Sequence, residues 1–426
     1  MNHFDYRDGE LFCEDVPLAA IAEAVGTPVY VYSSATLARH YTVLRDALRG
    51  AGSKDGKPLI AFAVKANSNL SVLKTLFDLG AGADTVSEGE IRRALAAGAP
   101  PERIVFSGVG KAAHELAFAV ETGVAEINVE SEPELDLLSA IAAEKGVRQA
   151  IAIRINPDVA AGGHAKISTG QADSKFGVSM AEAERLYAKA SNMAGVRPVG
   201  VACHIGSQIT DLAPMRAAFA KMRALVERLR ADGLSVERLD LGGGLGAPYF
   251  NQPDPPSPET YAVMVAEAVR GLDVQLAFEP GRVIAANAGV LLSRVIHVHR
   301  RPEGHSFLVL DAAMNDLVRP AMYDAFHHLR PLREPDAGAE PVTYDVVGPV
   351  CETGDTFARD RALPPLAADD LVAFLSAGAY GAVMASEYNT RPLVPEVMVK
   401  GDRWSVVRPR PSYDEMLARE PLAEWL

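Results

Sequence analysis

The feature that most constrains this fold is an alternation of short apolar segments with amphipathic ones between residues 59 and 278. Eight segments have the length and composition of buried strands: Leu59–Val64, Ala83–Val86, Arg103–Phe106, Glu126–Val129, Ala150–Ile155, Val199–Cys203, Val236–Leu241 and Val274–Phe278. Segments with apolar residues at helical spacing lie between them: Leu70–Leu79, Glu88–Ala97, Ala112–Glu121, Glu132–Glu144, Met180–Ser191, Asp211–Ala231 and Pro258–Gly271. This pattern predicts an α/β fold, a TIM-like (β/α)8 barrel whose reactive groups sit just past the carboxyl ends of its strands.

The pattern changes at Gly289, after which strands follow one another without comparable helices. Most of them alternate apolar and polar residues, as antiparallel strands do: Val290–Val298, Ser306–Asp311, Val342–Val347, Leu371–Ser376 and Val397–Val407. A further strand candidate, Pro28–Tyr32, lies outside the eight and is expected to join this second sheet. We therefore expect three parts: an N-terminal segment 1–35 that joins the β-domain, a barrel over 36–288, and a C-terminal β-rich domain over 289–426.

The net charge and the cysteine content limit which kinds of binding partner and which cellular compartment are expected for this protein. The formal net charge is −13 without a dense run of Lys or Arg, which argues against nucleic acid or an anionic membrane as a partner. No stretch approaches the length of a membrane span, and Met1–Val16 lacks the apolar core of a signal peptide. Cys13, Cys203 and Cys351 are far apart and odd in number. We therefore expect a cytoplasmic protein with neither a disulfide framework nor a metal site.

Lys65 is out of pattern at the end of the first predicted strand. The five residues before it, Ile60–Val64, are all apolar, and Asn67 and Ser68 follow shortly after. One interpretation is a solvated lysine at a strand end. The other is an amine that loses hydration against the apolar strand, so that its pKa falls and it can form a Schiff base with an aldehyde. The residues at the other strand ends decide between these two.

A run of glycines, Gly242, Gly243 and Gly244, follows the seventh predicted strand. Successive glycines let backbone N–H groups approach a phosphate closely, although many such runs are only turns. Phosphate sites in these barrels favour the loops after the seventh and eighth strands. The position of the run therefore favours a phosphate site.

The eighth and sixth predicted strands end in further polar residues. Glu279 could keep a pyridine nitrogen protonated and so make a cofactor ring an electron sink, and Arg282 could bind a phosphate or a substrate carboxylate. A salt bridge on the barrel rim is the alternative. His204 could stack on the ring and Ser207 could donate to the phosphate, whereas a lone histidine after a strand is more often a satisfied rim residue.

Four more polar residues at the second and fifth strand ends can face the same mouth: Asp84, Ser87, Arg154 and Asn156. We assign them no chemistry beyond orientation. The loop Gly162–Ser174 has no periodicity and is long enough to indicate a binding role.

These segments together resemble the motif set of the fold-type III pyridoxal phosphate decarboxylases: Ala63–Asn67, His204–Gln208, Leu241–Gly244 and Glu279–Arg282. Within that superfamily, other segments are similar to those of the diaminopimelate decarboxylases: Ile167–Gly170, Ser174–Gly177, Arg319–Tyr323, Cys351–Asp355 and Gly378–Tyr380. The resemblance spans nearly the whole chain in order. Met322 and Thr353 stand where Leu and Ser are more usual, and neither change removes a functional group.

The resemblance implies pyridoxal 5'-phosphate as the cofactor and decarboxylation of meso-2,6-diaminopimelate to L-lysine, the last step of lysine biosynthesis. It implies that Lys65 is the Schiff-base lysine and Cys351 the proton donor. The cofactor-binding set it implies is Lys65, His204, Ser207, Gly242, Gly243, Gly244, Glu279, Gly281, Arg282 and Tyr380. The substrate-binding set is Arg282, Arg319, Tyr323, Glu352 and Tyr380. It also implies a homodimer in which Cys351 and Glu352 come from the other subunit.

The residue types agree with such a substrate, because a diamino diacid needs an acidic partner for its distal ammonium and an arginine for its distal carboxylate. Glu352 and Arg319 supply these two groups. Cys351 is either a small buried residue or, as its polar and Gly-rich neighbours favour, a partly exposed functional thiol.

Three other functions remain as alternatives. A related decarboxylase of ornithine, arginine or carboxynorspermidine would share the barrel, but its substrates lack the distal carboxylate that Arg319 would meet. A racemase of this fold would place an arginine against the pyridine nitrogen. A non-catalytic pyridoxal phosphate carrier would need only the barrel and would leave residues 289–426 without a role.

Overall fold

The computed structural model describes residues 2–161, 169–171, 174–302 and 306–426. The chain divides into two compact units. The barrel unit comprises Ala38–Pro248 and Asp254–Ile284, and the sheet unit comprises Met1–Leu37, Tyr249–Pro253 and Ala285–Leu426. The motif residues Ile167 and Ser168, and most of the expected loop Gly162–Ser174, lie outside the described residues.

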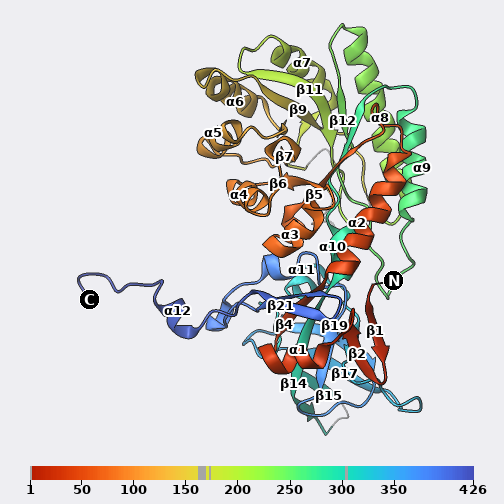
Figure 1. Ribbon diagram of the computed structural model, residues 1–426, viewed down its shortest axis with the longest axis vertical. Helices are drawn as coiled ribbons and strands as arrows, with labels where there is room; N and C mark the ends of the chain where they lie inside the picture. Colours follow the sequence, from red (N-terminus) through yellow and green to blue (C-terminus); the bar gives the residue numbers. More distant parts are fainter. Residues whose placement is uncertain (1, 162–168, 172–173, 303–305) are drawn as a thin grey trace. The chain divides into compact units, whose positions relative to one another are not determined.

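The barrel unit contains a closed ring of parallel strands, which confirms the predicted (β/α)8 architecture (Figure 1). The strands pair in chain order: β5 (Leu59–Ala63), β6 (Gly82–Thr85), β7 (Ile104–Phe106), β8 (Glu126–Val129), β9 (Gln149–Asn156), β11 (Val196–Cys203), β12 (Arg238–Asp240) and β13 (Gln275–Phe278). β13 pairs with β5 and so closes the ring. A short strand, β10 (Val178–Ser179), adds to β9.

Helices cover the outside of this ring (Figure 1). They are α2 (Ser34–Arg49), α3 (Leu70–Phe77), α4 (Glu88–Ala96), α5 (Ala113–Thr122), α6 (Glu132–Glu144), α7 (Met180–Ser191), α8 (Leu212–Ala231) and α9 (Pro258–Val269). Helices α4, α6, α7 and α9 each begin after a serine whose hydroxyl accepts the backbone N–H three residues further on. Each such cap stabilises its helix by about 1 kcal/mol and fixes where the chain leaves the preceding loop.

The sheet unit is built on one large sheet. Its strands are β4 (Val29–Ser33), β14 (Gly289–Arg300), β15 (Ser306–Leu310), β16 (Leu329–Pro331), β17 (Val342–Val347), β18 (Thr356–Leu363), β19 (Leu371–Phe374), β20 (Glu396–Lys400) and β21 (Arg403–Arg408). The order is β18-β17-β15-β14-β4-β20-β21, and β19 pairs with both β14 and β16. Most pairs are antiparallel, but β15–β17 and β20–β4 are parallel.

The prediction of a single strand over Val397–Val407 is wrong. Two antiparallel strands, β20 and β21, occupy this stretch, with Lys400 paired to Arg403. Gly401 between them has a positive φ of 61°, which suits a tight two-residue hairpin turn. The chain therefore reverses direction at Gly401 and Asp402, in the middle of the stretch that was predicted to be one strand.

The first residues form a small three-stranded sheet, β1 (Phe4–Arg7), β2 (Glu10–Cys13) and β3 (Val16–Pro17), followed by α1 (Leu18–Val25). Its apolar side chains share a core with the large sheet, in which Leu11 and Ile21 join Val31 and Leu292. Three short helices complete the chain: α10 (Arg282–Ala285), α11 (Arg319–Tyr323) and α12 (Tyr413–Leu417). Over the described ranges, every helix is too short or too polar to cross a membrane.

Candidate active site

Lys65 lies in a single 3-10 turn, Val64–Ala66, that directly follows β5. The strand before it is buried along its whole length, and the Lys65 side chain is 36% exposed. Its Nζ donates to Oδ2 of Asp84 at 2.6 Å, and the Asp84 side chain has no exposed surface. The structure therefore ties the lysine amine to the next strand end and does not leave it in open solvent.

Glu279 follows β13, is half-buried and lies near two buried carboxyls, those of Asp84 and Asp240. Its Oε1 accepts hydrogen bonds from Ser107 Oγ at 3.3 Å and Asn128 Nδ2 at 3.2 Å. Burial, reinforced by the carboxyls of Asp240 and Asp84, raises the pKa of Glu279 well above its ordinary value. Burial likewise raises the pKa of Asp240 to about 6. A carboxyl in this position can hydrogen-bond to a base placed against it.

His204, just past β11, is an uncharged imidazole. Its Nδ1 accepts the N–H of Gly243 at 3.2 Å, which assigns the ring proton to Nε2. Burial lowers the pKa of His204 well below its ordinary value, and the positive charges of Arg154 and Lys65 lower it further. The structure therefore supplies a flat, neutral ring at this strand end.

The glycine run after β12 packs tightly against its neighbours. A Cβ on Gly242 would lie 2.3 Å from the carbonyl oxygen of Cys203, and one on Gly243 would lie 2.3 Å from that of Glu279. Gly242 and Gly244 also have positive φ, 64° and 106°. Close packing of the barrel loops thus requires glycine here, whatever the run binds.

The backbone N–H groups of Gly242, Gly243 and Gly244 differ in their hydrogen-bond partners. Gly242 donates to Oδ1 of Asp240 at 2.7 Å, and Gly243 donates to His204. Gly244 accepts from the N–H of Ile209, while its own N–H meets no acceptor in the described part of the chain. Of the three glycines, Gly244 therefore keeps a donor available for a phosphate.

Arg282 and Ser207 form a pair between two strand ends. The Nε and Nη2 atoms of Arg282 donate to Ser207 Oγ at 3.2 and 3.1 Å, and Arg282 is 6% exposed. Gly281, beside it, is buried. A buried guanidinium next to a hydroxyl suits an anionic group, either a phosphate or a carboxylate.

Sequence reasoning gave no role to a charged network that joins three strand ends. Nη1 of Arg154 lies 2.7 Å from Oε1 of Glu130, the residue that follows β8. Glu130 also accepts the N–H groups of Gly108 at 2.8 Å and Gly177 at 3.2 Å. Arg154 lies over the ring of Phe176 at 4.8 Å. The place of Glu130 directly after a predicted strand was the available signal.

Two more residues near Glu279 were missed by sequence reasoning. Ser107 directly follows the third barrel strand, and Asn128 lies in the fourth.

The predicted residues Ser87 and Asn156 instead hold local turns. Ser87 Oγ accepts the N–H of Glu90 at the start of α4, and Asn156 Oδ1 accepts the N–H of Asp158. These two residues support the strand ends rather than the group around Lys65 and Glu279.

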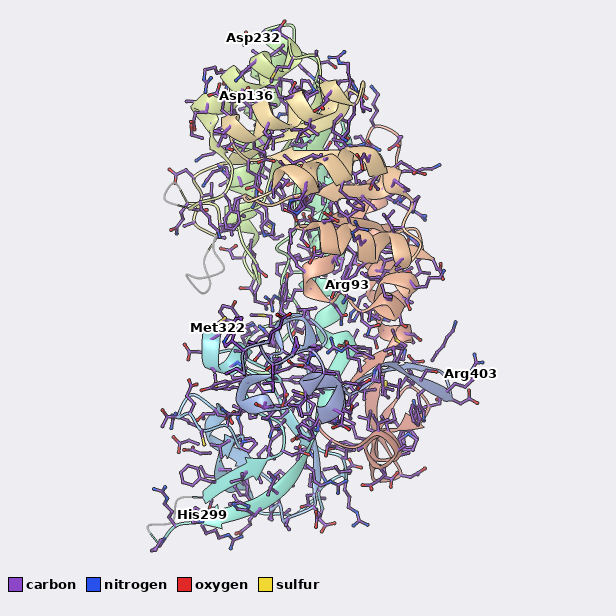
Figure 2. All side chains as sticks on the ribbon, turned by 90° about the vertical axis from the view of Figure 1, so that its left-hand side faces the viewer. Arg93, Asp136, Asp232, His299, Met322 and Arg403 are labelled. Carbon is purple, nitrogen blue, oxygen red and sulfur yellow. The ribbon has the colours of Figure 1, made fainter. Side chains whose placement is uncertain are left out.

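The remaining predicted residues belong to the sheet unit. Arg319 begins α11 and is 7% exposed. Its Nη1 donates to Tyr249 Oη at 3.3 Å and lies 3.0 Å from His327 Nε2. Tyr323 ends the same helix and is half-buried, while Tyr380 is half-buried with a positive φ of 56°. Met322 is exposed on the surface of this unit (Figure 2).

Hydrogen bonds to the Asp355 side chain fix the loop that carries Cys351 and Glu352. The buried Asp355 carboxylate accepts the N–H groups of Met314 and Val350, both at 2.7 Å. Cys351 and Glu352 themselves are exposed. Cys13 and Cys203 are buried thiols, so Cys351 is the accessible member of the three free cysteines.

Two residues of the neighbouring segment contact this loop. Asn389 Oδ1 accepts the N–H of Cys351 at 3.2 Å. Glu352 raises the pKa of Tyr388 by its charge and by a hydrogen bond to the phenol. The loop is therefore ordered although its two predicted functional side chains face outward.

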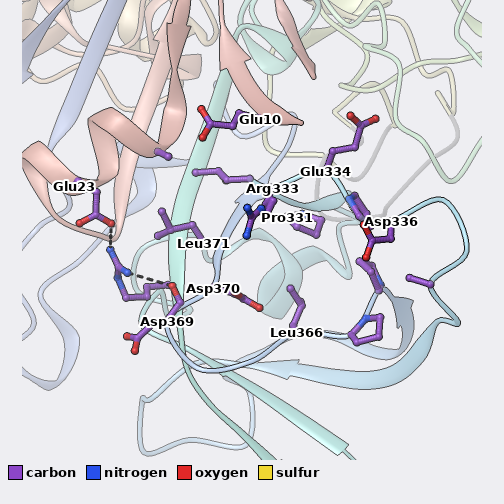
Figure 3. A pocket seen from close by; sticks show the side chains of 17 residues that line it. Glu10, Glu23, Pro331, Arg333, Glu334, Asp336, Leu366, Asp369, Asp370 and Leu371 are labelled. Atoms are coloured by element: carbon purple, nitrogen blue, oxygen red, sulfur yellow. Dashed lines mark hydrogen bonds and ion pairs between the residues drawn. The ribbon is translucent and has the colours of Figure 1, made fainter. Parts of the chain in front are cut away.

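A groove of about 610 Å³ in the sheet unit is lined by none of the predicted site residues (Figure 3). Its wall carries Glu10, Arg333, Asp336 and Leu371 among others, and Arg294 within it is paired with Glu23 at 2.7 Å. Over the described ranges, the structure contains no group of three or more His, Cys, Asp or Glu side chains placed to hold a metal ion.

Residues 36–286 match the family described as pyridoxal-dependent decarboxylase, pyridoxal binding domain. The whole chain is also similar to proteins named diaminopimelate decarboxylase. It is 49% identical to that of Zymomonas mobilis over 424 residues, which cover 99% of both chains. It is 49% identical to that of Pseudomonas aeruginosa over 422 residues, again with 99% of both covered.

The chain is also similar to solved structures of diaminopimelate decarboxylases. The diaminopimelate decarboxylase of M. jannaschii in complex with L-lysine has a TM-score of 0.94 at 34% identity and covers 100% of both chains. That of Helicobacter pylori, also with L-lysine, has a TM-score of 0.89 at 40% identity, with 94% of this chain and 98% of the other covered.

Proposed function

Because the chain belongs to the pyridoxal-dependent decarboxylases, and within them to the diaminopimelate decarboxylases, we propose that Lys65 and Cys351 carry the reaction that converts meso-2,6-diaminopimelate to L-lysine and carbon dioxide. This reaction is the last step of lysine biosynthesis. The observation that carries the assignment of the residues is the gathering of a lysine amine, the carboxyl of Glu279 and an arginine–hydroxyl pair at the strand ends of one barrel.

The side chains at these strand ends fit pyridoxal 5'-phosphate group by group. Lys65 would hold the aldehyde carbon and Glu279 the pyridine nitrogen. Arg282, Ser207 and the N–H of Gly244 would hold the phosphate. Asp84 Oδ1 and Asn128 Oδ1, beside Lys65 and Glu279, are buried without a hydrogen-bond partner among the described residues, which suits a site that receives a polar group.

When bound, the cofactor supplies a conjugated ring that accepts the electron pair left by the departing carboxylate. Glu279 would make this possible by pairing its carboxylate with the protonated pyridine nitrogen, because a negative charge against the ring favours the protonated form. The neutral ring of His204 would lie against one face of the cofactor without adding a positive charge. Gly242, Gly243, Gly281 and Tyr380 would complete the walls.

Arg319 would bind the distal carboxylate of the substrate and Glu352 its distal ammonium, with Arg282, Tyr323 and Tyr380 as further contacts. A buried guanidinium makes a charge-assisted, two-pronged contact with a carboxylate. Substrates that lack this carboxylate, such as ornithine or arginine, would leave Arg319 without its anion. A site built for a polar group discriminates strongly against such analogues.

Cys351 would return a proton to the substrate α-carbon after carbon dioxide leaves. We place Cys351 and Glu352 in the site of a second copy of the chain, since both side chains face outward from their own unit. We further place the enzyme in the cytoplasm, because its three cysteines are free thiols, which a reducing compartment preserves.

The test is carbon dioxide release by the reconstituted protein from a panel of amino diacids and diamino acids. We expect meso-2,6-diaminopimelate to be turned over fastest by a wide margin. Faster release from ornithine, arginine or carboxynorspermidine would mean a related decarboxylase. Racemisation without carbon dioxide would mean a racemase, and a visible chromophore without any turnover would mean a carrier.

A further inference from the structure

Two neutral side chains of the sheet unit hold the guanidinium of Arg319. Its Nη1 lies 3.3 Å from Tyr249 Oη and 3.0 Å from His327 Nε2. All three side chains belong to buried residues, with 7% of Arg319, 6% of Tyr249 and 3% of His327 exposed. Both contacts use the same nitrogen, so together they limit rotation of the planar group.

The backbone of the sheet fixes the orientation of the His327 ring. Its Nδ1 lies 3.0 Å from the carbonyl oxygen of Leu375, the residue after β19. A carbonyl can only accept a hydrogen bond and a guanidinium can only donate one, so Nδ1 carries the ring proton and Nε2 accepts from Arg319. The N–H of Leu375 in turn donates to the carbonyl of His328 at 2.8 Å. A strand end therefore presents an acceptor to the arginine in a set direction.

Tyr249 packs against both partners. Its ring centroid lies 5.6 Å from Cζ of Arg319, and its ring meets that of His327 edge-on at 6.4 Å. A tyrosine hydroxyl and a neutral imidazole orient a guanidinium without cancelling its positive charge. These two contacts therefore orient the guanidinium and do not compete with an anion for its charge.

We propose that His327, assisted by Tyr249, is a positioning residue that sets the affinity for the distal carboxylate of the substrate by holding Arg319. The proposal rests on the proposed function, in which Arg319 reads that carboxylate. His327 itself need not touch the substrate. Its effect reaches the substrate through the direction in which Arg319 points.

The experiment compares kcat and KM for meso-2,6-diaminopimelate in the full-length, cofactor-loaded enzyme and its variants. His327→Leu removes the acceptor, and we expect KM to rise about tenfold with kcat within about threefold of wild type. His327→Gln offers an amide oxygen in place of Nε2, and we expect KM to return to within about threefold of wild type. The visible spectrum of the cofactor should be the same in all variants.

A double-substitution cycle distinguishes positioning from an independent role. Arg319→Leu alone should lower kcat/KM on the order of a hundredfold. If His327 acts through Arg319, adding His327→Leu to that variant should change kcat/KM by less than about twofold. A further tenfold loss in the double variant would overturn the proposal, as would a wild-type KM in His327→Leu.

His328→Leu is the matched control, because the ring of His328 lies against Phe250 at 4.7 Å instead of against Arg319. We expect its KM to be unchanged. If His327→Leu does not fold, Tyr249→Phe keeps the ring and removes one acceptor, and a KM rise of about threefold is expected. An unchanged KM in that variant would contradict the proposal.

The wild-type enzyme and the two single variants together show whether the positioning role of His327 fails or the proposed function itself fails. If the wild-type protein releases no carbon dioxide from meso-2,6-diaminopimelate, the proposed function fails. If wild type is active and Arg319→Leu has a normal KM, the assignment of Arg319 fails. If Arg319→Leu is impaired and His327→Leu is normal, only the positioning role fails.

Discussion

The Nζ atom of Lys65 lies 2.6 Å from Oδ2 of Asp84, a carboxylate on the neighbouring strand with no exposed surface. The parallel register of β5 and β6, which sets Ala63 opposite Asp84, brings this carboxylate beside the turn that carries the lysine. Two adjacent strands therefore fix where the amine points. No comparable buried anchor holds Lys74, which pairs with Asp78 on the surface of its own helix.

We expect the purified protein to be yellow and borohydride reduction to attach the cofactor to Lys65. A lysine held at a strand end by a buried carboxylate is oriented for one target, whereas Lys74 pairs with an exposed carboxylate on the surface. Peptide mapping after reduction locates the label. Lys65→Ala should abolish it and Lys74→Ala should leave it unchanged. A label on Lys74 or Lys175, or a colourless protein after reconstitution, would contradict the assignment of Lys65.

The sequence pattern predicted the barrel well because its strands are buried on both faces. Such strands are short apolar runs, and their ends fall within a few residues of the predicted ones, as β5 (Leu59–Ala63) shows. The edge strand β18 was missed because it carries three charged residues in a row, the exposed Arg359 and Asp360 and the half-buried Arg361. Charged residues are common on edge strands and hide the alternation on which the prediction depends.

The candidate site was predictable only where a residue's place in the chain indicates its place in the barrel. Lys65 and Glu279 follow strands, and strand ends meet on one face of a barrel. The contact between Tyr249 and Arg319 joins residues 70 positions apart. No periodicity links such a pair, because side-chain contacts across loops depend on packing and not on spacing.

A second prediction concerns stability and pH, through Glu126 inside the barrel. Burial raises the pKa of this carboxyl to about 7, although Arg238 lies 3.2 Å away. Between the ordinary value of 4.5 and 7, the folded state binds more protons than the unfolded state. The free energy of unfolding therefore falls as pH rises through this window, by up to about 3 kcal/mol from this group.

Glu126→Gln has no such titration. Relative to wild type, we expect its free energy of unfolding to rise from pH 5 to pH 8, measured by urea denaturation. Glu132→Gln is the control, because Arg185 lowers the pKa of the Glu132 carboxyl to about 2, so that it is ionised in both states over this range. An equal pH dependence in Glu126→Gln and wild type would show that Glu126 does not titrate abnormally.

A third prediction concerns the loop that carries Cys351. A Cβ on Gly348 would lie 2.4 Å from Oδ2 of Asp355 and 2.7 Å from the carbonyl of Ala312. Both are fixed groups, and Asp355 holds the loop through two backbone N–H groups. Gly348→Ala should therefore lower the free energy of unfolding by about 1–3 kcal/mol.

Gly354→Ala is the matched control in the same loop. Its Cβ would meet Oε1 of Glu352 at 2.8 Å, and this atom is the end of an exposed, flexible side chain that can move away. We expect thermal unfolding of this variant to stay close to wild type. Equal destabilisation of both variants would show that the Asp355 anchor is not what makes Gly348 necessary.

The last prediction is that each active site is shared between two copies of the chain. Cys351 and Glu352 are exposed on an ordered loop of the sheet unit, and Lys65 belongs to the barrel unit. In a two-fold dimer the same surface of each subunit faces its partner, so a loop of one chain can complete the site of the other. Lys65→Ala and Cys351→Ala should each be nearly inactive alone.

When the two variants carry different tags and are unfolded and refolded together, random pairing makes about half of the dimers mixed. In a mixed dimer with shared sites, one site carries both lesions and the other carries none. Activity should therefore recover to about a quarter of wild type. If the lysine and the cysteine of one chain served the same site, every site would carry one lesion. Activity near zero in a sample that contains tagged mixed dimers would exclude the shared site.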